Sequence, residues 1–161
     1  MSGKVLVLMG SASDADTMRE TVKVLNEFGI DATLTVSSAH RSPQRTHDLV
    51  SKAEADGYSV IVAGAGAAAH LAGVVASLTV LPVIGVPLAG TPLAGFDALL
   101  STVQMPAGIP VATVAVGKAG AQNAGHLAVQ ILAVADPSLR DKLRVKRAAM
   151  AEAVEEAAAK L

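Results

Sequence analysis

A histidine and an arginine stand next to each other in the segment SSAHRSP, residues 37–43. An imidazole takes up and releases protons near neutral pH, which makes His40 a candidate for general acid–base chemistry. Ser42 and Pro43 are of the types that favour the cap and the first residue of a helix, so Arg41 should lie beside a helix N-terminus. The free N–H groups and the dipole of such a terminus favour an anion. The segment therefore predicts a site for phosphate or carboxylate, with a proton-transfer group beside it.

The segment GSASD, residues 10–14, has the composition of a second ligand loop. The hydroxyls of Ser11 and Ser13 could hold a phosphate together with backbone N–H groups, while Asp14 could accept hydrogen bonds from a sugar. A simpler interpretation is also open, because Ser13 and Asp16 have the spacing of a helix capping box. Capping and ligand binding are compatible.

The glycine-rich segment AGAGAAAHLAG, residues 63–73, formally matches a dinucleotide-binding fingerprint whose last glycine is replaced by alanine. That fingerprint needs an acidic residue about 20 positions further on, and none occurs before Asp97. A P-loop motif is absent from the sequence as well. What remains is a loop that lets a ligand approach the backbone closely, followed by His70 on the next helix. A lone histidine in an apolar helix is more often a hydrogen-bonded core residue than a catalyst, so both interpretations of His70 stay open.

The other two histidines do not suggest a site. His47 is predicted on the surface, and His126 lies in an alanine-rich helix as a structural or interface residue. No two histidines have the close spacing of a zinc motif, and the chain has no cysteine. We therefore expect no metal site.

Five short runs rich in Val, Ile and Leu alternate with helix-like segments, and these elements must position the three loops. The runs lack polar alternation, which is typical of parallel strands covered on both faces. The pattern predicts a single α/β domain over residues 1–161, with three layers doubly wound around a central, mainly parallel sheet. Ligands bind at the carboxyl ends of such strands, where the three loops should meet. The expected strands are Lys4–Met9, Ile30–Val36, Ser59–Ala63, Pro82–Val86 and Val111–Val116, and the expected helices are Asp14–Phe28, Pro43–Asp56, Ala67–Leu78, Leu93–Val103 and Ala119–Val134.

Composition and charge argue against several classes of protein. The formal net charge is -1, which does not favour binding to nucleic acid. No Asp, Glu, Lys or Arg lies between Asp56 and Asp97, but glycines and prolines divide this stretch into pieces shorter than the roughly 20 apolar residues of a membrane span. The N-terminus lacks a signal-peptide pattern, and the absence of cysteine fits a reducing compartment. We expect a cytoplasmic protein with neither nucleic acid nor a membrane as partner.

The last segment of the chain, residues 138–161, predicts a long helix with an apolar stripe. The apolar residues repeat with an offset that keeps them on one face of a nearly straight helix. They are Leu139, Leu143, Met150, Val154 and Leu161. The expected helix Ala67–Leu78 is apolar nearly all round and must be buried on every side. Both features predict contacts with other copies of the chain.

Six motifs, in this order and over nearly the whole chain, closely resemble the 5-(carboxyamino)imidazole ribonucleotide mutase family of purine biosynthesis. They are GSASD, SSAHRSP, AGAGAAAHLAG, PVIGVP, VQMPAGIPV and GKAGAQNA. The related aminoimidazole ribonucleotide carboxylases share the fold and the first two motifs, whereas the third motif, which ends at residues 70–73, resembles that of the mutases. Ala72 departs from the family pattern, in which proline is expected, and this bears on the shape of the third loop.

The resemblance implies a flavodoxin-like fold and a reaction. It places Ser11 and Arg41 near the phosphate of a ribonucleotide and Asp14 near its ribose, and it makes His40 the proton-transfer residue. A carboxyl group would move from an exocyclic nitrogen to ring carbon four through transient release of CO2, with no metal, ATP or organic cofactor. Residues 65–69 are small and would suit a pocket that confines CO2. The expected substrate-binding residues are Ser11, Ser13, Asp14, Ser38, Ala39, Arg41, Gly66, Ala68, His70 and Leu71.

The resemblance also implies a homo-octamer, in which the terminal helix packs on a neighbouring subunit. Two other functions stay open. One is a carboxylase that uses free CO2 and aminoimidazole ribonucleotide, whose rate added bicarbonate would raise. The other is a noncatalytic flavodoxin-like module that binds a phosphorylated ligand, which would show affinity without turnover.

Overall fold

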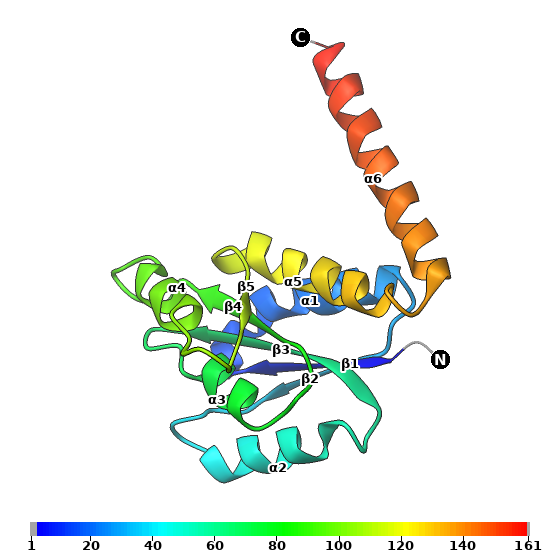
Figure 1. The fold of residues 1–161 in the computed structure, drawn as a ribbon. Helices are drawn as coiled ribbons and strands as arrows, with labels where there is room; N and C mark the ends of the chain where they lie inside the picture. Colours follow the sequence, from blue (N-terminus) through cyan, green and yellow to red (C-terminus); the bar gives the residue numbers. More distant parts are fainter. Residues whose placement is uncertain (1–2, 161) are drawn as a thin grey trace.

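A five-stranded parallel sheet with the strand order β2-β1-β3-β4-β5 forms the centre of the fold (Figure 1). The computed structural model describes residues 3–160. The predicted doubly wound α/β architecture is confirmed, and the long C-terminal helix is present. The strands are β1 (Lys4–Met9), β2 (Ala32–Val36), β3 (Tyr58–Gly66), β4 (Val83–Leu88) and β5 (Ala112–Thr113); the helices are the short 3-10 helix η1 (Ala12–Asp14), α1 (Ala15–Glu27), α2 (Pro43–Ala53), α3 (Leu71–Ser77), α4 (Phe96–Val103), α5 (Gly117–Leu132) and α6 (Pro137–Ala158).

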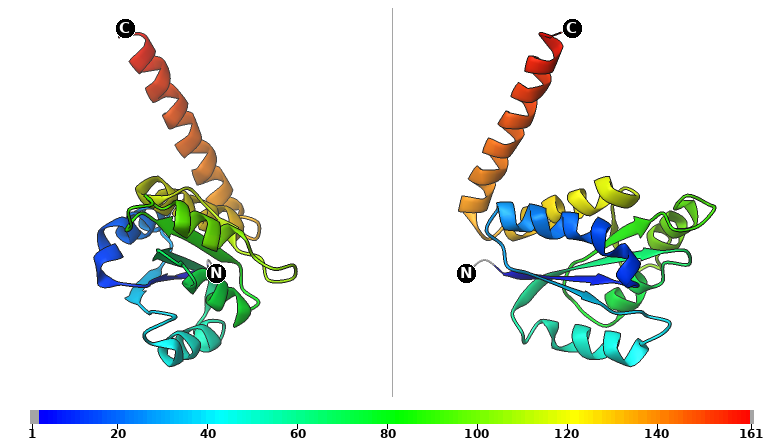
Figure 2. Two further views of the ribbon diagram at one scale, coloured as in Figure 1. Left: turned by 90° about the vertical axis from the view of Figure 1, so that its left-hand side faces the viewer. Right: turned by 180° about the vertical axis from the view of Figure 1, so that it is seen from behind.

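Helices cover both faces of the sheet, which gives the three expected layers. Helices α1 and α5 lie on one face, and α2 and α3 lie on the other, as the views in Figures 1 and 2 show. Successive residues of β1 point to opposite faces: Val5 and Val7 pack with α1 and α5, whereas Leu6 and Leu8 pack with α2 and α3. Because both faces are buried, the inner strands need no polar alternation.

The third strand is longer, and the third helix shorter, than the sequence predicts. Strand β3 continues to Gly66, because its last residues still pair with β4. Helix α3 begins only at Leu71, not at Ala67. The intervening residues form a turn in which Ala67 and Ala69 have φ angles of 53° and 42°, in the left-handed region. The apolar composition of this turn concealed it within an apparently continuous helix.

The two edge strands also differ from expectation. Strand β5 contains only Ala112–Thr113 instead of residues 111–116, and it pairs with β4 alone. Strand β2 is only partly buried, whereas its sequence predicts coverage on both faces. An edge strand has one neighbour and less helix above and below it, so its apolar residues are shielded less completely.

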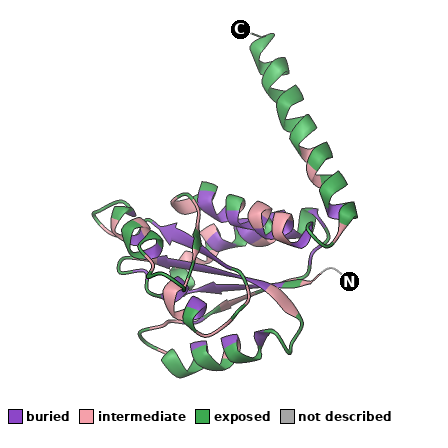
Figure 3. Cartoon of the chain, viewed as in Figure 1, coloured by how far each residue is buried: buried purple, intermediate pink, exposed green. Residues whose placement is uncertain are grey.

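Helix α6 leaves the domain as an arm whose far end lies well away from the sheet (Figures 1 and 2). Leu139, at its start, is buried in the core. Further along, Val145, Met150 and Val154 are 70%, 58% and 69% exposed, and Figure 3 shows the arm as exposed over most of its length. Leu161, the last member of the predicted stripe, lies outside the described residues. Within residues 3–160, no helix is both long enough and apolar enough to cross a membrane.

Candidate active site

The loops at the carboxyl ends of β1, β2, β3 and β4 surround a hollow of about 360 Å³. With this strand order, the chain leaves β1 and β3 toward opposite sides, which opens a crevice between their loops. Every predicted site residue except Ala68 lines the hollow, and Ala68 is exposed in the third loop. The lining residues are Gly10, Ser11, Ser13, Asp14, Ser38, Ala39, His40, Arg41, Ala65, Gly66, Ala67, Ala69, His70, Leu71, Gly90 and Thr91.

A larger hollow, of about 840 Å³, lies at the opposite edge of the sheet. It is formed by the ends of α2 and α3 and the starts of β4 and β5, and Glu54 is the one ionisable residue among the described residues that line it. Acid–base chemistry needs converging titratable groups. The smaller hollow is therefore the better candidate for a catalytic site.

Hydrogen bonds between the serines of the loop after β1 hold that loop in shape. Ser11 caps η1, and its Oγ accepts hydrogen bonds from the backbone N–H of Ser13 (3.4 Å) and from the Ser13 hydroxyl (2.8 Å). The prediction of a capping box formed by Ser13 and Asp16 is wrong. Ser11 is the residue that caps a helix here, η1, and Asp16 forms an ion pair with Arg19 (2.7 Å). Both serines line the hollow, and the Ser11 hydroxyl also caps η1.

Partial burial raises the pKa of the Asp14 carboxyl above its ordinary value. Hydrogen bonds from the backbone N–H of Ser11 and the hydroxyl of Ser13, together with the charge of Arg41, lower this pKa but do not offset the lost hydration. A carboxylate that is short of hydrogen-bond donors gains when a ligand supplies them. Asp14 is therefore suited to accept hydrogen bonds from ligand hydroxyls.

Arg41 joins the loops that follow β1 and β2. Its Nη2 donates a hydrogen bond to the carbonyl oxygen of Gly10 (2.7 Å), and its Nε donates to Ser38 Oγ (3.4 Å). The backbone N–H of Arg41 donates to the same hydroxyl (3.1 Å). A guanidinium has more N–H donors than these contacts use, so it can also bind an anion.

Ser42 occupies the cap position of α2, and Pro43 lies in the first turn, as predicted. The Ser42 hydroxyl nevertheless does not cap the helix. It accepts a hydrogen bond from the N–H of Ser38 (3.0 Å) and donates one to the carbonyl oxygen of Ser38 (3.2 Å). This contact closes the turn that carries His40 and leaves the start of α2 without a side-chain cap.

The imidazoles of His40 and His70 form a direct pair. Nε2 of His40 lies 2.7 Å from Nδ1 of His70, and the ring planes are inclined by 76°. His70 immediately precedes α3 and is exposed, so its interpretation as a core residue is wrong. A hydrogen bond between two imidazole nitrogens requires a proton on one and a lone pair on the other. The turn before α3 therefore places a second titratable ring beside the predicted proton-transfer residue.

The loop after β4 contributes lining residues that the sequence analysis missed. Gly90 and Thr91 line the hollow, and Thr91 Oγ1 donates a hydrogen bond to Oδ2 of Asp97 (2.8 Å) in α4. The sequence could have indicated them only through their position, because they follow a buried strand whose carboxyl end lies at the same edge of the sheet. Ala72, where the family pattern has proline, lies in the first turn of α3, packs in the core and does not line the hollow.

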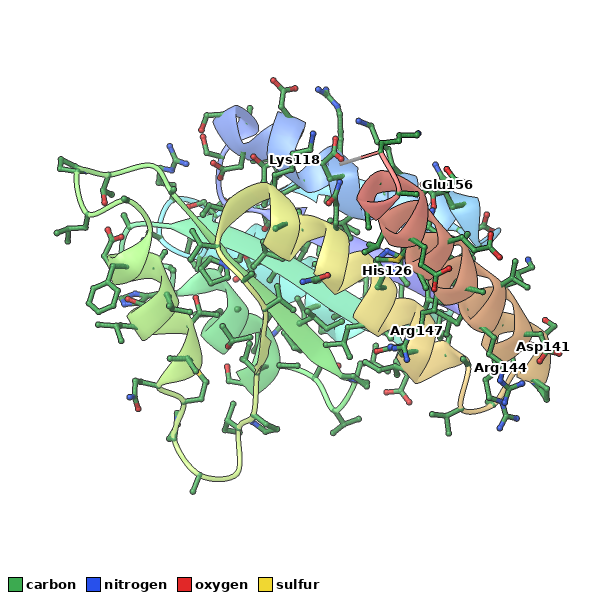
Figure 4. The ribbon with its side chains drawn as sticks, turned by 90° about the horizontal axis from the view of Figure 1, so that it is seen from above. Lys118, His126, Asp141, Arg144, Arg147 and Glu156 are labelled. Atoms are coloured by element: carbon green, nitrogen blue, oxygen red, sulfur yellow. The ribbon has the colours of Figure 1, made fainter. Side chains whose placement is uncertain are left out.

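His47 and His126 lie away from the hollow, as predicted. His47 is exposed, with Nδ1 3.5 Å from Oδ1 of Asp48. The ring of His126 packs edge-on against Phe28 at a centroid distance of 5.9 Å, and burial lowers its pKa. Figure 4 shows His126 on α5, and it lines another hollow together with Lys146, Arg147 and Met150 of α6. Within residues 3–160, no group of three His, Cys, Asp or Glu side chains is placed to hold a metal ion.

Known proteins are similar to this chain over nearly its whole length, including the loops around the hollow. Residues 4–153 match the family model described as AIR carboxylase. A relative from Pyrococcus horikoshii, named N5-carboxyaminoimidazole ribonucleotide mutase, is 52% identical over 155 residues, which are 96% of this chain and 86% of that protein. A relative of the same name from Saccharolobus solfataricus is 55% identical over 141 residues, 88% of each chain.

Similarity extends to a solved structure. The structure described as "Crystal structure of Treponema denticola PurE" matches with a TM-score of 0.88 and 28% sequence identity, over 98% of this chain and 97% of that chain. The parallel sheet, its flanking helices and the long terminal helix thus form an arrangement that a known protein also adopts.

Proposed function

The chain belongs to the AIR carboxylase family, and we propose that its reaction is that of an N5-carboxyaminoimidazole ribonucleotide mutase. Such an enzyme is an isomerase of purine biosynthesis, which moves a carboxyl group from an exocyclic nitrogen to ring carbon four of the substrate. The observation that carries the proposal is the hollow, where a carboxylate, a guanidinium, hydroxyls and two imidazoles converge from the loops of one chain. The whole chain, residues 1–161, would form one catalytic domain.

The hollow has the groups that a phosphorylated ribose requires. Arg41 and the hydroxyls of Ser11 and Ser13 would hold the phosphate through charge-assisted hydrogen bonds. Asp14 would accept hydrogen bonds from the ribose hydroxyls, which replace the water lost on burial. The other substrate contacts would come from Ser38, Ala39, Gly66, Ala68, His70 and Leu71.

His40 would act first as a general acid and then as a general base. In the first step it donates a proton to the exocyclic nitrogen as the bond between that nitrogen and the carboxyl carbon breaks, which leaves an amine and CO2. In the second step ring carbon four attacks CO2, and His40 removes the proton from that carbon. The proton that was given is recovered, so the cycle needs no oxidant, metal ion or nucleotide cofactor.

CO2 must stay beside the ring between these two steps. Ala65, Ala67 and Ala69 line the hollow, and their small side chains leave room close to the backbone without offering a nucleophile. A closed apolar compartment keeps the two reactants at a high effective concentration and excludes water. These alanines would therefore hold CO2 next to ring carbon four.

The assembly would be a homo-octamer in which α6 packs on a neighbouring subunit. The exposed Met150 and Val154 support this, because residues four apart lie on one face of a helix and an exposed apolar face marks an interaction surface. The family resemblance supplies the number of copies. The metabolic reaction and the absence of cysteine suit a cytoplasmic enzyme with a small-molecule substrate as its partner.

Turnover of the pure protein tests the proposal against its alternatives. With 5-(carboxyamino)imidazole ribonucleotide alone, product should form at the full rate, and neither bicarbonate nor EDTA should change that rate. A carboxylase would instead need aminoimidazole ribonucleotide and respond to added bicarbonate. A noncatalytic module would bind the ribonucleotide in calorimetry without forming product.

A further inference from the structure

We propose that His70 is a positioning residue that fixes which nitrogen of His40 exchanges the proton. Nδ1 of His70 accepts a hydrogen bond from the Nε2–H of His40, at the observed separation of 2.7 Å. This holds the neutral form of His40 in one tautomer and leaves its Nδ1 as the nitrogen that faces the substrate. The inference rests on the proposed function, because it assigns a partner to the proposed acid–base residue.

The direction of this hydrogen bond follows from the reaction cycle. As an acid, His40 carries protons on both ring nitrogens, so its Nε2 can only donate. His70 must then accept at Nδ1 and carry its own proton on Nε2. If His70 donated instead, the contact would break each time His40 became charged. Only the arrangement in which His40 donates persists in both halves of the cycle.

The backbone that carries each of the two rings is held in place by its own contacts. Ala69 and Leu71, on either side of His70, are buried, and the carbonyl oxygen of His70 accepts a hydrogen bond from the N–H of Val74 (3.0 Å) in α3. The turn that carries His40 is closed by the N–H of Ser42, which donates to the carbonyl oxygen of Ser38 (2.9 Å). These contacts fix the backbone positions from which the two rings reach each other, and the hydrogen bond between the rings sets their orientation.

A fixed tautomer matters for a residue that must act in both directions. When a neutral imidazole presents an N–H where a base is needed, proton removal stops, and orienting groups in other acid–base sites prevent this by bonding to the far nitrogen. Both rings are exposed in the single chain, and a ligand in the hollow would exclude the water that competes for Nε2 of His40.

Two substitutions at the same position separate positioning from proton exchange. In His70→Asn, the side-chain oxygen can accept the hydrogen bond from His40 near the place of Nδ1, but the amide cannot be protonated. His70→Leu fills similar space and accepts nothing. We expect kcat to fall less than about 10-fold in His70→Asn and about 100-fold in His70→Leu, with a rise in KM, from the lost substrate contact, that is similar in both variants and smaller than the fall in kcat of His70→Leu. His47→Asn, on the exposed face of α2, should leave both constants unchanged.

Nitrogen-15 NMR of histidine-labelled protein gives a readout that does not depend on turnover. The ring signals of His40, assigned by their absence in His40→Asn, should show the Nε2-protonated tautomer in wild-type protein and in His70→Asn, and a mixture of tautomers in His70→Leu. Equal loss of kcat in both His70 variants would overturn positioning in favour of direct proton exchange by His70. A rise in KM alone, or an unchanged tautomer in His70→Leu, would overturn it as well. If wild-type protein formed no product, the proposed function would fail, while the NMR result would still test the hydrogen bond.

Discussion

The exposed side chains at the carboxyl edge of the sheet differ from those on the outer half of α6 in whether they have partners within the chain. At the sheet edge, His40 and Arg41 are exposed, yet each has a partner in the same chain, His70 and the carbonyl oxygen of Gly10. On α6, Met150 and Val154 are exposed and apolar, and they lie on an arm that projects from the domain (Figure 3). The polar groups of the site thus have partners within one chain, whereas these apolar side chains of the arm are left exposed by the described residues.

The charged residues of α6 also differ between the half near the domain and the outer half. The half of the helix nearer the domain is mainly basic and is tied to it: Lys142 Nζ donates to the carbonyl oxygen of Phe28 (2.9 Å), and Lys146 Nζ donates to Glu27 Oε2 (2.8 Å). The outer half carries Glu152, Glu155 and Glu156. Figure 4 shows Arg144 near the start of the helix and Glu156 near its outer end. Residues near the domain thus bond to the chain's own fold, and the proposed assembly would use the outer ones.

If the site is organised within one chain, the largest effect should come from its proton carrier. His40→Asn keeps some hydrogen bonding but cannot exchange protons near neutral pH, so kcat should fall by about 100-fold or more while the nucleotide still binds. Steady-state kinetics beside calorimetry with the ribonucleotide would measure both quantities. Near-normal turnover, or a loss of affinity alone, would make His40 a binding or structural residue.

The next largest effect should come from Arg41. Arg41→Ala removes a charge-assisted contact that is present in the ground state and the transition state alike, so KM should rise about 10- to 100-fold with a smaller change in kcat. Arg45→Ala is the matched control, because Arg45 bonds to Thr35 and the carbonyl oxygen of Val36 on β2 and does not line the hollow. Equal losses in both variants would show that a general change in charge, and not the site, explains the effect.

Changes on α6 should affect assembly more than chemistry. Deleting the chain after Pro137 should break the particle into smaller species, because the exposed apolar face of α6 would be lost. Met150→Asp combined with Val154→Asp keeps the helix and should have the same effect. Light scattering measures the particle mass, and an unchanged mass in both variants would refute the role of α6.

The smallest effect concerns the pH dependence of substrate binding. Asp14 must be ionised to accept hydrogen bonds fully, and burial raises its pKa. As the pH falls, substrate binding should therefore begin to weaken at a higher pH than it would with an aspartate of ordinary pKa. If protonated Asp14 binds no substrate, KM should roughly double at the pH equal to that pKa. Asp14→Asn should bind more weakly at neutral pH and lose this part of the dependence. An identical acid-side profile in wild-type protein and Asp14→Asn would contradict the assignment, because only the substrate's own titration would remain.

The sequence predicts correctly which loops meet at one edge of the sheet, because this depends on their positions along the chain. The loops with Ser11, Asp14, His40 and Arg41 follow apolar strands, and parallel strands bring such loops to one edge. The sequence does not predict correctly where β3 ends and α3 begins, because these boundaries depend on pairing between strands that are distant in the chain. The extension of β3 along β4 set the start of α3, and this placed His70 on the surface beside His40 instead of in the core.

Two further features were beyond sequence reasoning for physical reasons. Thr91 belongs to no recognisable sequence motif. It lines the hollow because its loop lies at the same carboxyl edge of the sheet. The direction of α6 depends on a few contacts near Leu139 and Lys142, which no periodicity encodes. The stripe itself predicts only that a partner surface is needed.

The fate of the carboxyl group tests the central claim most directly. Substrate labelled with carbon-13 in its carboxyl group is converted by the pure protein in a solution that contains unlabelled bicarbonate, and the label in the product is measured by mass spectrometry. If one chain's hollow confines CO2 between two proton transfers by His40, nearly all product should keep the label. Product with the isotopic composition of the dissolved bicarbonate would contradict the account and identify a carboxylase that draws CO2 from solution.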